Sequence, residues 1–464
     1  MSTAFSLLAS AARRCLVPAA PPEPFVRIPD AEWAAVLWWA QRHRVLLHLA
    51  SSVDERALAN TNPQVAEGLR GYRQSAGVRA LASARESCLL QRACDDAAVS
   101  VVMASGWALG ECYYVRSEAR EVDHRVRLVV DEADRQRAAV LLKSLGYADG
   151  PRDPLALLTL GRSRVALDTT GDDSGRTRVL TLDGTRIRVP GPESWLLRVL
   201  APRGARPRML TLERACDVVS LIETGSFDWD ACFRLAAHRR RLVRVRAGIT
   251  AACRLLDRPV PRAVSRIPSG ARDRRAAEFL ESSAVQVATP RASVLASRLK
   301  SVAPDEQGSV GRYSPTPDSV IDRMMICAKV SPQDVVLDLG CGDGRVAIRA
   351  AQRFGAVGIG VDRDGALIQA ARTGAAAAGQ QDRTRFIEGD LFEVDLTQAT
   401  VICLYLQRFA YRRLAEWLRA NARPGTRIVS HDVGFPDWLP ASADMVVSDL
   451  RTSIVYCWSV PART

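Results

Sequence analysis

The chain has 464 residues, which is too long for a single hydrophobic core, so two or three domains are expected. Its composition, 47% hydrophobic and 25% charged, is ordinary for a globular protein, and no apolar run reaches the roughly 20 residues that a membrane span needs. The first residues lack the basic start of a signal peptide, and Arg13 and Arg14 interrupt their short apolar stretch.

Cysteine usage and charge indicate the compartment and the kind of partner. The 11 cysteines include no CxxC pair, which favours free thiols in a reducing cytosol over a disulfide framework. The reducing environment indicates a cytoplasmic protein. The 5 histidines do not pair with cysteines at ligand spacing, so we expect no metal site. The net charge of +13 lies entirely before Tyr313, because the remainder has 17 Arg and Lys against 17 Asp and Glu. Such an excess permits an acidic partner: a carboxylate, a phosphate or nucleic acid.

Helical and strand-like patterns alternate in the first 260 residues. Helical patterns cover Glu32–Leu49, Trp195–Leu200 and Leu212–Glu223, and strand-like runs cover Val99–Met103 and Val126–Val130. This mixture predicts an α/β or α+β domain. The next segment, to Arg312, is rich in Pro, Ser, Arg and Ala, with a helical pattern near Arg274–Glu281. We therefore expect three parts: a domain at 1–262, a linker with helices at 263–312 and a second domain at 313–464.

The second domain alternates strands and helices. The expected strands are Val335–Leu339, Val357–Val361, Arg385–Glu388, Thr400–Leu406, Arg427–His431 and Ile454–Trp458, and the expected helices are Val346–Arg353, Ala366–Ala378 and Tyr411–Asn421. This order predicts a doubly wound, Rossmann-like parallel sheet. Loops rather than helices separate the last runs, which predicts an antiparallel hairpin at the sheet edge.

A glycine-rich loop follows the first of these strands. The strand ends in Asp338 and Leu339, and the loop reads GCGDGR (340–345) before a helix begins. Glycines allow a tight turn and a close approach to a ligand. The second strand ends in Asp362, an acid placed to bind both hydroxyls of a ribose, and the third ends before Asp390, which can accept from an adenine amino group. An NAD-binding loop would read GxGxxG instead, so the pattern favours S-adenosylmethionine as the cofactor.

From Tyr313 to about Pro440 the chain resembles the class I methyltransferases, and among them the small protein-lysine methyltransferases of archaeal and mitochondrial type. Those modify adenine-nucleotide translocase or the c-ring protein of ATP synthase. The resemblance lies in PTP (315–317), DVVLDLGCGDGR (334–345), the acids Asp362 and Asp390, LYL (404–406) and PGTRIVSHD (424–432). It implies that the cofactor is contacted by a set of nine residues: Thr316, Asp338, Gly340, Cys341, Gly342, Asp362, Arg363, Asp390 and Leu391.

The methyl acceptor is expected at the carboxyl ends of the later strands. There we place Tyr405 and His431 as candidate catalytic residues, although packing over the cofactor and a structural loop histidine remain alternative roles for them. Methyl transfer gains most from alignment, and an amine acceptor must first lose a proton. LYLQ (404–407) stands where many adenine and glutamine methyltransferases have Asp/Asn-Pro-Pro-Tyr, which weakens a nucleic-acid interpretation.

Residues 30–260 resemble an uncharacterised family of bacterial nucleotidyltransferase-like proteins. The segments that carry the resemblance include VMASGWAL (102–109), LVV (128–130), RQRAAVLLKSLGY (135–147) and ACD (215–217). An Asp-x-Asp pair usually stands before the Leu-Val strand end and would hold two magnesium ions, but this chain has Arg125 and Arg127 there. Using Asp123 instead still leaves Arg125 as the second member. We therefore expect no nucleotidyl transfer, and a basic substrate-binding site for an anionic peptide terminus or phosphate unless both arginines are ordinary surface charges.

Three functions remain open. Nucleotidyltransferase-like proteins of this kind resemble tailoring enzymes encoded beside ribosomally made peptides. The leading hypothesis is therefore methyl esterification of the C-terminal carboxylate of a lasso peptide, with the N-terminal domain binding the substrate. Lysine N-methylation of a protein is the alternative that the catalytic resemblance favours. RNA methylation is third, because no interleaved aromatics and arginines of a stacking platform are present.

Overall fold

The computed structural model describes residues 3–17, 28–122, 125–149, 157–160, 163–169, 176–200, 210–238, 242–265, 314–448 and 451–462. The chain divides into two compact units. The N-terminal unit comprises residues 1–24, 40–54 and 73–286, and the C-terminal unit comprises residues 25–39, 55–72 and 287–464. The expected linker lies outside the described residues from 266 onward, and so does its helical pattern near Arg274–Glu281.

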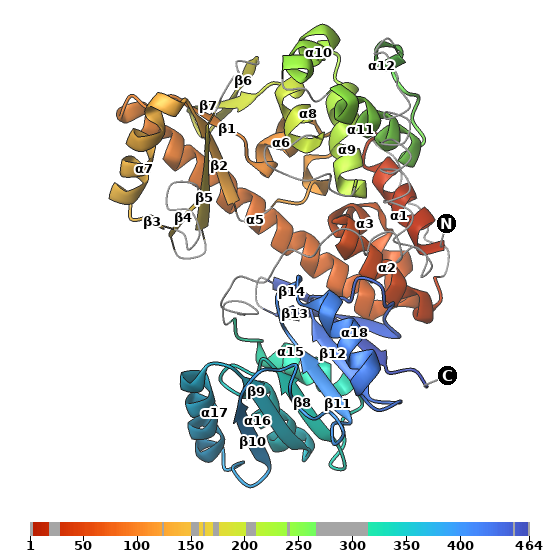
Figure 1. Ribbon diagram of the computed structural model, residues 1–464. Coiled ribbons are helices and arrows are strands. Elements are labelled where there is room, and N and C mark those ends of the chain that lie inside the picture. The colour runs from red at the N-terminus through yellow and green to blue at the C-terminus, as the bar shows by residue number, and fades with distance from the viewer. Residues whose placement is uncertain are drawn as a thin grey trace. The chain divides into compact units, whose positions relative to one another are not determined.

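The C-terminal unit is built on a seven-stranded sheet in the order β10-β9-β8-β11-β12-β14-β13, drawn in green to blue in Figure 1. Its strands are β8 (Val335–Leu339), β9 (Val357–Asp362), β10 (Thr384–Glu388), β11 (Val401–Leu404), β12 (Arg427–His431), β13 (Ser442–Ser448) and β14 (Arg451–Ser459). Its C-terminal helices are α15 (Asp318–Cys327), α16 (Arg345–Phe354), α17 (Gly365–Ala377) and α18 (Tyr411–Asn421). The first five strands in the sheet order are parallel, and β14 and β13 are antiparallel, so the predicted Rossmann-like architecture is confirmed.

Burial on both faces explains why the central strands of this sheet read as continuous apolar runs. All four residues of β11 are buried, and Val336, Val401 and Val429 join one apolar cluster with Met324 of α15. A parallel sheet covered by helices on both faces requires such sequences. The predicted antiparallel pairing at the sheet edge is present between β12 and β14, but the sheet also has one strand that was not predicted, β13, which pairs with β14 at the edge.

Two N-terminal segments also pack in the C-terminal unit. One is the part of α2 (Asp30–His43) up to Trp39, and the other is α4 (Glu55–Thr61) with the first residues of α5 (Pro63–Asp96). The Trp38 indole N–H donates to the Phe435 carbonyl at 3.1 Å. A Cβ at Gly68 would lie 2.3 Å from Met445 Cβ, so this glycine allows α5 to approach β13 closely. The grouping therefore differs from a division at residue 313.

The N-terminal unit holds a five-stranded sheet, β1-β2-β5-β4-β3, and a separate hairpin, β6–β7. Its strands are β1 (Val101–Met103), β2 (Arg125–Val130), β3 (Ala148–Asp149), β4 (Leu157–Leu160), β5 (Ser163–Thr169), β6 (Thr177–Leu182) and β7 (Thr185–Pro190). Its further helices are α1 (Thr3–Arg14), α3 (Leu46–Ser52), α6 (Gly106–Tyr113), α7 (Arg135–Ser144), α8 (Pro192–Leu200), α9 (Leu212–Ile222), α10 (Trp229–His238), α11 (Leu242–Leu255) and α12 (Arg262–Ser265). The pattern predicted as one helix over Glu32–Leu49 is broken at Arg44, whose φ of 55° is left-handed.

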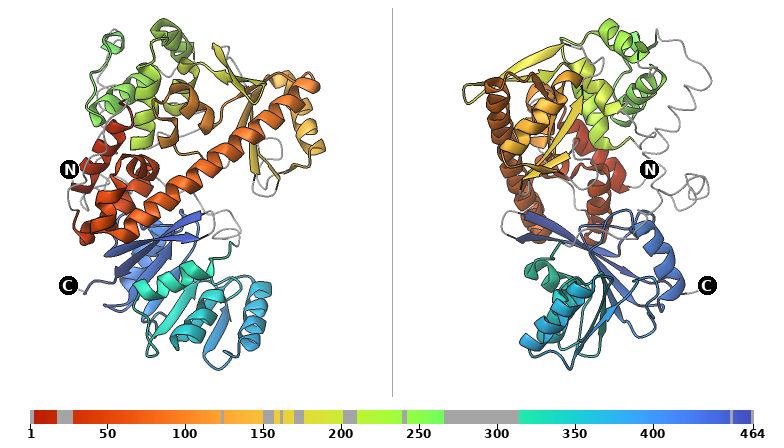
Figure 2. Two further views of the ribbon diagram at one scale, coloured as in Figure 1. Left: turned by 180° about the vertical axis from the view of Figure 1, so that it is seen from behind. Right: turned by 60° about the vertical axis from the view of Figure 1, so that its left-hand side comes forward.

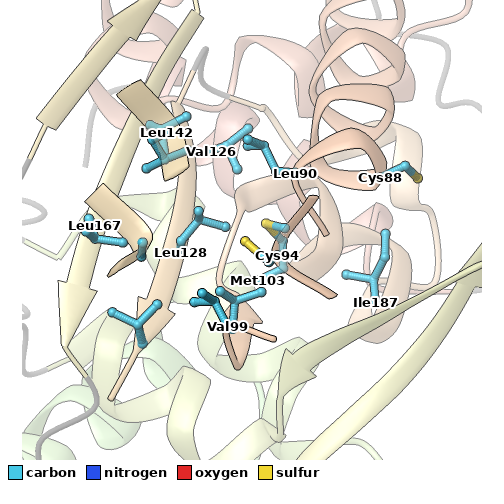
Figure 3. Packing of buried hydrophobic residues seen from close by; sticks show 14 of the residues in the cluster. Cys88, Leu90, Cys94, Val99, Met103, Val126, Leu128, Leu142, Leu167 and Ile187 are labelled. Carbon is cyan, nitrogen blue, oxygen red and sulfur yellow. The ribbon is translucent and has the colours of Figure 1, made fainter. Parts of the chain in front are cut away.

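One face of the sheet in the N-terminal unit forms its core. Val126 and Leu128 of β2 pack with Leu167 of β5 and with Cys94 of the long helix α5, as Figure 3 shows. The left view of Figure 2 shows this helix, drawn in orange, from the side. Because side chains alternate along a strand, the residues between these apolar ones point to the opposite face. That opposite face carries Arg125 and Arg127.

The ACD segment of the nucleotidyltransferase resemblance is used for packing. Asp217 on α9 is buried, accepts from the Tyr114 hydroxyl at 2.6 Å and pairs with Arg120 at 2.9 Å. Glu213 lies one turn away, 3.5 Å from Arg120. Burial raises the pKa of Glu213 to about 7, although Arg120 and Arg44 lower it in part. The cluster fixes α9 beside the residues that precede β2.

Candidate functional site

The loop after β8 turns sharply at its glycines. Gly340 and Gly342 have φ values of 82° and 54°, which a residue with a side chain rarely adopts. The N–H groups of Gly340 and Cys341 donate to the Val361 carbonyl at 2.8 and 2.9 Å, which ties the loop to β9. A Cβ at Gly340 would lie 2.6 Å from Leu406 Cδ2. The loop therefore forms a cradle that only glycine allows at this position.

Asp362, at the end of β9, is held in place by two backbone donors. Its Oδ2 accepts from the Gly342 N–H at 2.8 Å, and its Oδ1 accepts from the Asp364 N–H at 3.1 Å. A carboxylate can accept about four hydrogen bonds, so capacity remains for a ligand. The acid is therefore preorganised against the glycine loop, as its predicted role in binding a ribose requires.

Asp338 lies next to this carboxylate and is only 5% exposed. Burial raises the pKa of Asp338 to about 7, and the charges of Asp362 and Asp343 add to the shift. Like charges this close destabilise one another unless a cation is bound between them. The carboxylates therefore suit a positively charged ligand, which S-adenosylmethionine is.

The other predicted cofactor residues lie at the neighbouring strand end and on the segment before α15. Asp390 Oδ1 accepts from the Phe392 N–H at 3.0 Å, and its Oδ2 pairs with the Arg363 guanidinium. Burial opposes these hydrogen bonds, but together they lower the pKa of Asp390. Leu391 beside it is buried. Thr316 is buried, and its carbonyl accepts from Arg345 at 3.4 Å, so the PTP segment is tied to the start of α16.

Tyr405 and His431 meet at the carboxyl ends of β11 and β12. Their rings stack with centroids 4.0 Å apart. His431 is fully buried, with Nε2 2.9 Å from Ser453 Oγ and Nδ1 3.4 Å from Thr316 Oγ1. Burial lowers the pKa of His431 to about 4, so the ring is neutral at pH 7. Tyr405 is half-buried, and His431 lies behind it.

Two residues beside this pair were not identified as site residues from the sequence. Asp432 follows His431 with a left-handed φ of 59°, and Arg451 lies at the start of β14. Arg451 Nη2 donates to Asp432 Oδ2 at 2.5 Å and to the Tyr405 hydroxyl at 3.4 Å. Asp432 was within a matched motif, but Arg451 carried no local signal, because only the pairing of β14 with β12 brings it here.

In the N-terminal unit, Arg125 and Arg127 share the polar face of β2. Arg127 Nη1 pairs with Asp168 Oδ2 on β5 at 2.7 Å, and Arg198 lies 3.8 Å from the same oxygen. The Arg127 N–H donates to Ser105 Oγ at 3.1 Å. Within the described residues no group of three or more His, Cys, Asp or Glu could hold a metal ion, and Asp123 lies outside them. In the register of β2 against β5, Arg127 lies opposite Ala166, and its side chain reaches diagonally to Asp168, the acid that the neighbouring strand supplies.

Comparisons with known proteins match both units. Residues 338–442 match the family described as ANTKMT methyltransferase domain, and residues 29–155 match the family described as uncharacterised nucleotidyltransferase. A protein-lysine N-methyltransferase from Saccharolobus islandicus is 36% identical over 149 residues, which are 32% of this chain and 92% of that protein. The chain belongs to the same methyltransferase family as this archaeal relative. It is an S-adenosylmethionine-dependent methyltransferase with an N-terminal nucleotidyltransferase-like domain.

Two further relatives of the methyltransferase domain differ in the acceptors that they are named for. An adenine nucleotide translocase lysine N-methyltransferase from Mus musculus is 29% identical over 23% of this chain and 47% of its own length. An RNA methyltransferase from Salinibacter ruber, crystallised with S-adenosyl-L-homocysteine, is 41% identical over 32% of this chain and 96% of its own, with a TM-score of 0.31. The chain thus spans most of the archaeal relative and about half of the mouse one.

The cofactor fits the residues that the structure brings together. The glycine cradle, the fixed Asp362 carboxylate and the buried Asp338 suit a ligand with hydroxyl groups and positive charge. Asp390 and Leu391 form the neighbouring strand end, where an adenine is expected.

In the part of the chain that the structure describes, no helix is long and apolar enough to cross a membrane. All 11 cysteines are free.

Proposed function

We propose that the methyltransferase domain transfers a methyl group to the side-chain amine of a lysine in a protein. The observation that carries this proposal is the 36% identity to a protein-lysine N-methyltransferase over 92% of its length. The relative from Mus musculus, also named for a lysine acceptor, supports it. Methyl esterification of a lasso-peptide carboxylate, which the sequence made the leading hypothesis, has no comparable support among these relatives.

The residues at the carboxyl ends of β11 and β12 suit an amine acceptor. S-adenosylmethionine supplies an electrophilic methyl group on sulfur, which the free electron pair of the amine attacks while the S–C bond leaves its pair on sulfur. A lysine ammonium must therefore first lose a proton, here to solvent water. We expect Tyr405 to contact the acceptor. We expect His431, which is buried and neutral, to position the Tyr405 ring by stacking rather than to take the proton itself.

We propose that the N-terminal unit assists by binding the protein substrate at Arg125 and Arg127. Both side chains are half-buried on one strand face, and Arg198 adds a third cation there. Asp168 neutralises part of this charge through Arg127. These arginines suit an anionic group of the substrate, since guanidinium groups bind carboxylates and phosphates through charge-assisted hydrogen bonds.

Product analysis tests the acceptor class. The full-length protein is incubated with methyl-labelled S-adenosylmethionine and a bacterial protein and RNA extract, with Asp362→Ala as the inactive control. Label should appear in methyl-lysine after acid hydrolysis. Label released as methanol by mild base would instead show a carboxyl ester, and label removed by ribonuclease would show RNA. Either result would overturn the lysine proposal.

A charge reversal tests the N-terminal site. We expect the double variant Arg125→Glu/Arg127→Glu to raise KM for the labelled protein substrate by about tenfold, because two favourable charges become repulsive. The matched control is Arg186→Glu/Arg188→Glu, two arginines spaced the same way on β7. Equal KM values for the two double variants would show that Arg125 and Arg127 do not bind substrate.

A further inference from the structure

The carboxylate of Asp432 is fixed by the backbone, whereas its cationic partner is exposed to solvent. Asp432 Oδ1 accepts from the Ile454 N–H at 2.8 Å, and its side chain is 20% exposed. Its left-handed φ of 59° directs the residue away from the course of β12. Arg451, which pairs with Oδ2, has a side chain that is 54% exposed. The carboxylate is thus a fixed acceptor, and the guanidinium can leave it for water.

The same guanidinium also reaches Tyr405. Arg451 Nη2 lies 2.5 Å from Asp432 Oδ2 and 3.4 Å from the Tyr405 hydroxyl, so one nitrogen bridges the ends of β12 and β11. In a doubly wound sheet these strand ends border the ligand crevice. A positively charged nitrogen is therefore already bound where the acceptor is expected. A lysine ammonium would offer the same charge and the same donors to these two groups.

From this arrangement we infer that Arg451 is a stand-in for the acceptor, which means that its guanidinium occupies the place of the substrate's amine in the free enzyme. Asp432 and Tyr405 then form the receptor for the substrate's lysine amine. The inference rests on the proposed function and names the residues that recognise its substrate. The acceptor lysine arrives as an ammonium ion and displaces the Arg451 guanidinium from Asp432. Asp432 holds the lysine while Tyr405 orients its nitrogen, and the proton leaves to water before the amine attacks the methyl group. Arg451 keeps Asp432 neutralised when no substrate is bound.

The alternative is that Arg451 itself receives a carboxylate acceptor, and the geometry distinguishes the two cases. A carboxylate would have to displace Asp432, which a backbone N–H and a left-handed backbone hold in place. An amine has to displace only the exposed Arg451 side chain, whose ion pair is screened by water. The two cases predict opposite effects of removing Arg451. Its loss assists an amine acceptor and weakens a carboxylate acceptor.

Kinetics with poly-L-lysine as the probe substrate test the inference on the full-length protein. For Arg451→Met we expect KM to fall by about two- to fivefold, the range of an exposed ion pair. For Asp432→Asn we expect KM to rise by about tenfold or more, because the ammonium loses its charged partner. In the double variant KM should equal that of Asp432→Asn, since Arg451 no longer competes for a charge. Arg385→Met, an exposed arginine on β10, is the matched control and should leave KM unchanged.

A second variant gives a readout that needs no added acceptor. In Arg451→Lys the new side chain places an amine against Asp432, so the enzyme should methylate its own residue 451 when S-adenosylmethionine is added. The chain has only three lysines of its own, Lys143, Lys300 and Lys329, so mass spectrometry identifies the new site unambiguously. Arg451→Lys/Asp362→Ala, which should not bind the cofactor, is the control.

The outcomes separate the two proposals. Methylation of poly-L-lysine by the wild type, with KM unchanged or raised in Arg451→Met, would overturn the stand-in inference and leave lysine methylation in place. A wild type that methylates neither poly-L-lysine nor any lysine of a protein extract would overturn lysine methylation itself. A fall in KM for Arg451→Met, or a methyl group on residue 451 of Arg451→Lys, supports the inference.

Discussion

Replacing Asp362 with alanine should nearly abolish cofactor binding while the fold survives. The Asp362 carboxylate already accepts from the Gly342 and Asp364 N–H groups, which fix its orientation and leave acceptor capacity for the two ribose hydroxyls that it is expected to bind. Hydrogen bonds to charged groups contribute roughly 1.5–3 kcal/mol each, so losing two ribose contacts costs about 3–6 kcal/mol. That corresponds to about a hundred- to ten-thousandfold weaker binding. Asp362 itself is half-buried, so water can enter the space that its carboxylate leaves and accept from the two N–H groups.

Calorimetric titration with S-adenosyl-L-homocysteine measures this loss. Asp362→Asn keeps one acceptor oxygen and should fall between the wild type and Asp362→Ala. Asp382→Ala, an exposed acid before β10, should bind like the wild type. Thermal unfolding of all variants checks the fold. An affinity of Asp362→Ala within threefold of the wild type would refute the reasoning.

Three further predictions follow from individual residues. The pKa of Asp338 is raised to about 7, so its ionisation should destabilise the cofactor-free protein as pH rises from about 4 to 7. In urea unfolding, the free energy of unfolding of Asp338→Asn should rise relative to that of the wild type between pH 4 and 7. Parallel pH profiles of the two free energies would contradict the raised pKa. Gly340→Ala should lose cofactor affinity at least as severely as Asp362→Ala, because the added Cβ would meet Leu406 and a φ of 82° is strained for alanine. A titration curve of Gly340→Ala that matches the wild-type curve would disprove the cradle. The N-terminal unit should show no magnesium-dependent nucleotidyl transfer, since Arg127 faces Asp168 where metal ligands are required; label transferred from a nucleoside triphosphate and lost with chelator would refute this.

The C-terminal unit includes residues 25–39 and 55–72, which limits how the methyltransferase domain can be isolated. A fragment starting at residue 301 would lack Trp38, Gly68 and the other N-terminal residues that pack in this unit. Its loss of activity would then reflect exposed packing surface on β13 as well as lost substrate binding. Point variants of the full chain avoid that ambiguity.

The sequence by itself predicted the features that depend on neighbouring residues. Strand and helix periodicity, the glycine loop after β8 and the acids at the ends of β9 and β10 are local patterns, because φ preferences and side-chain alternation act over a few residues. For the same reason the β6–β7 hairpin was predictable and was overlooked. Asp183 and Gly184, with φ values of 48° and 72°, form the two-residue Asp-Gly turn that favours such hairpins.

Only the tertiary structure decided which distant residues meet. Arg451 and Tyr405 are 46 residues apart and become neighbours because β14 runs antiparallel to β12 inside the sheet. Trp38 and Phe435 are separated by 397 residues, and no local pattern indicates that a helix near the N-terminus packs with the methyltransferase fold. The pairing of Arg127 with Asp168 depends in the same way on the register of β2 against β5. Strand order and register are set by burial across the whole sheet, which a window of sequence does not contain.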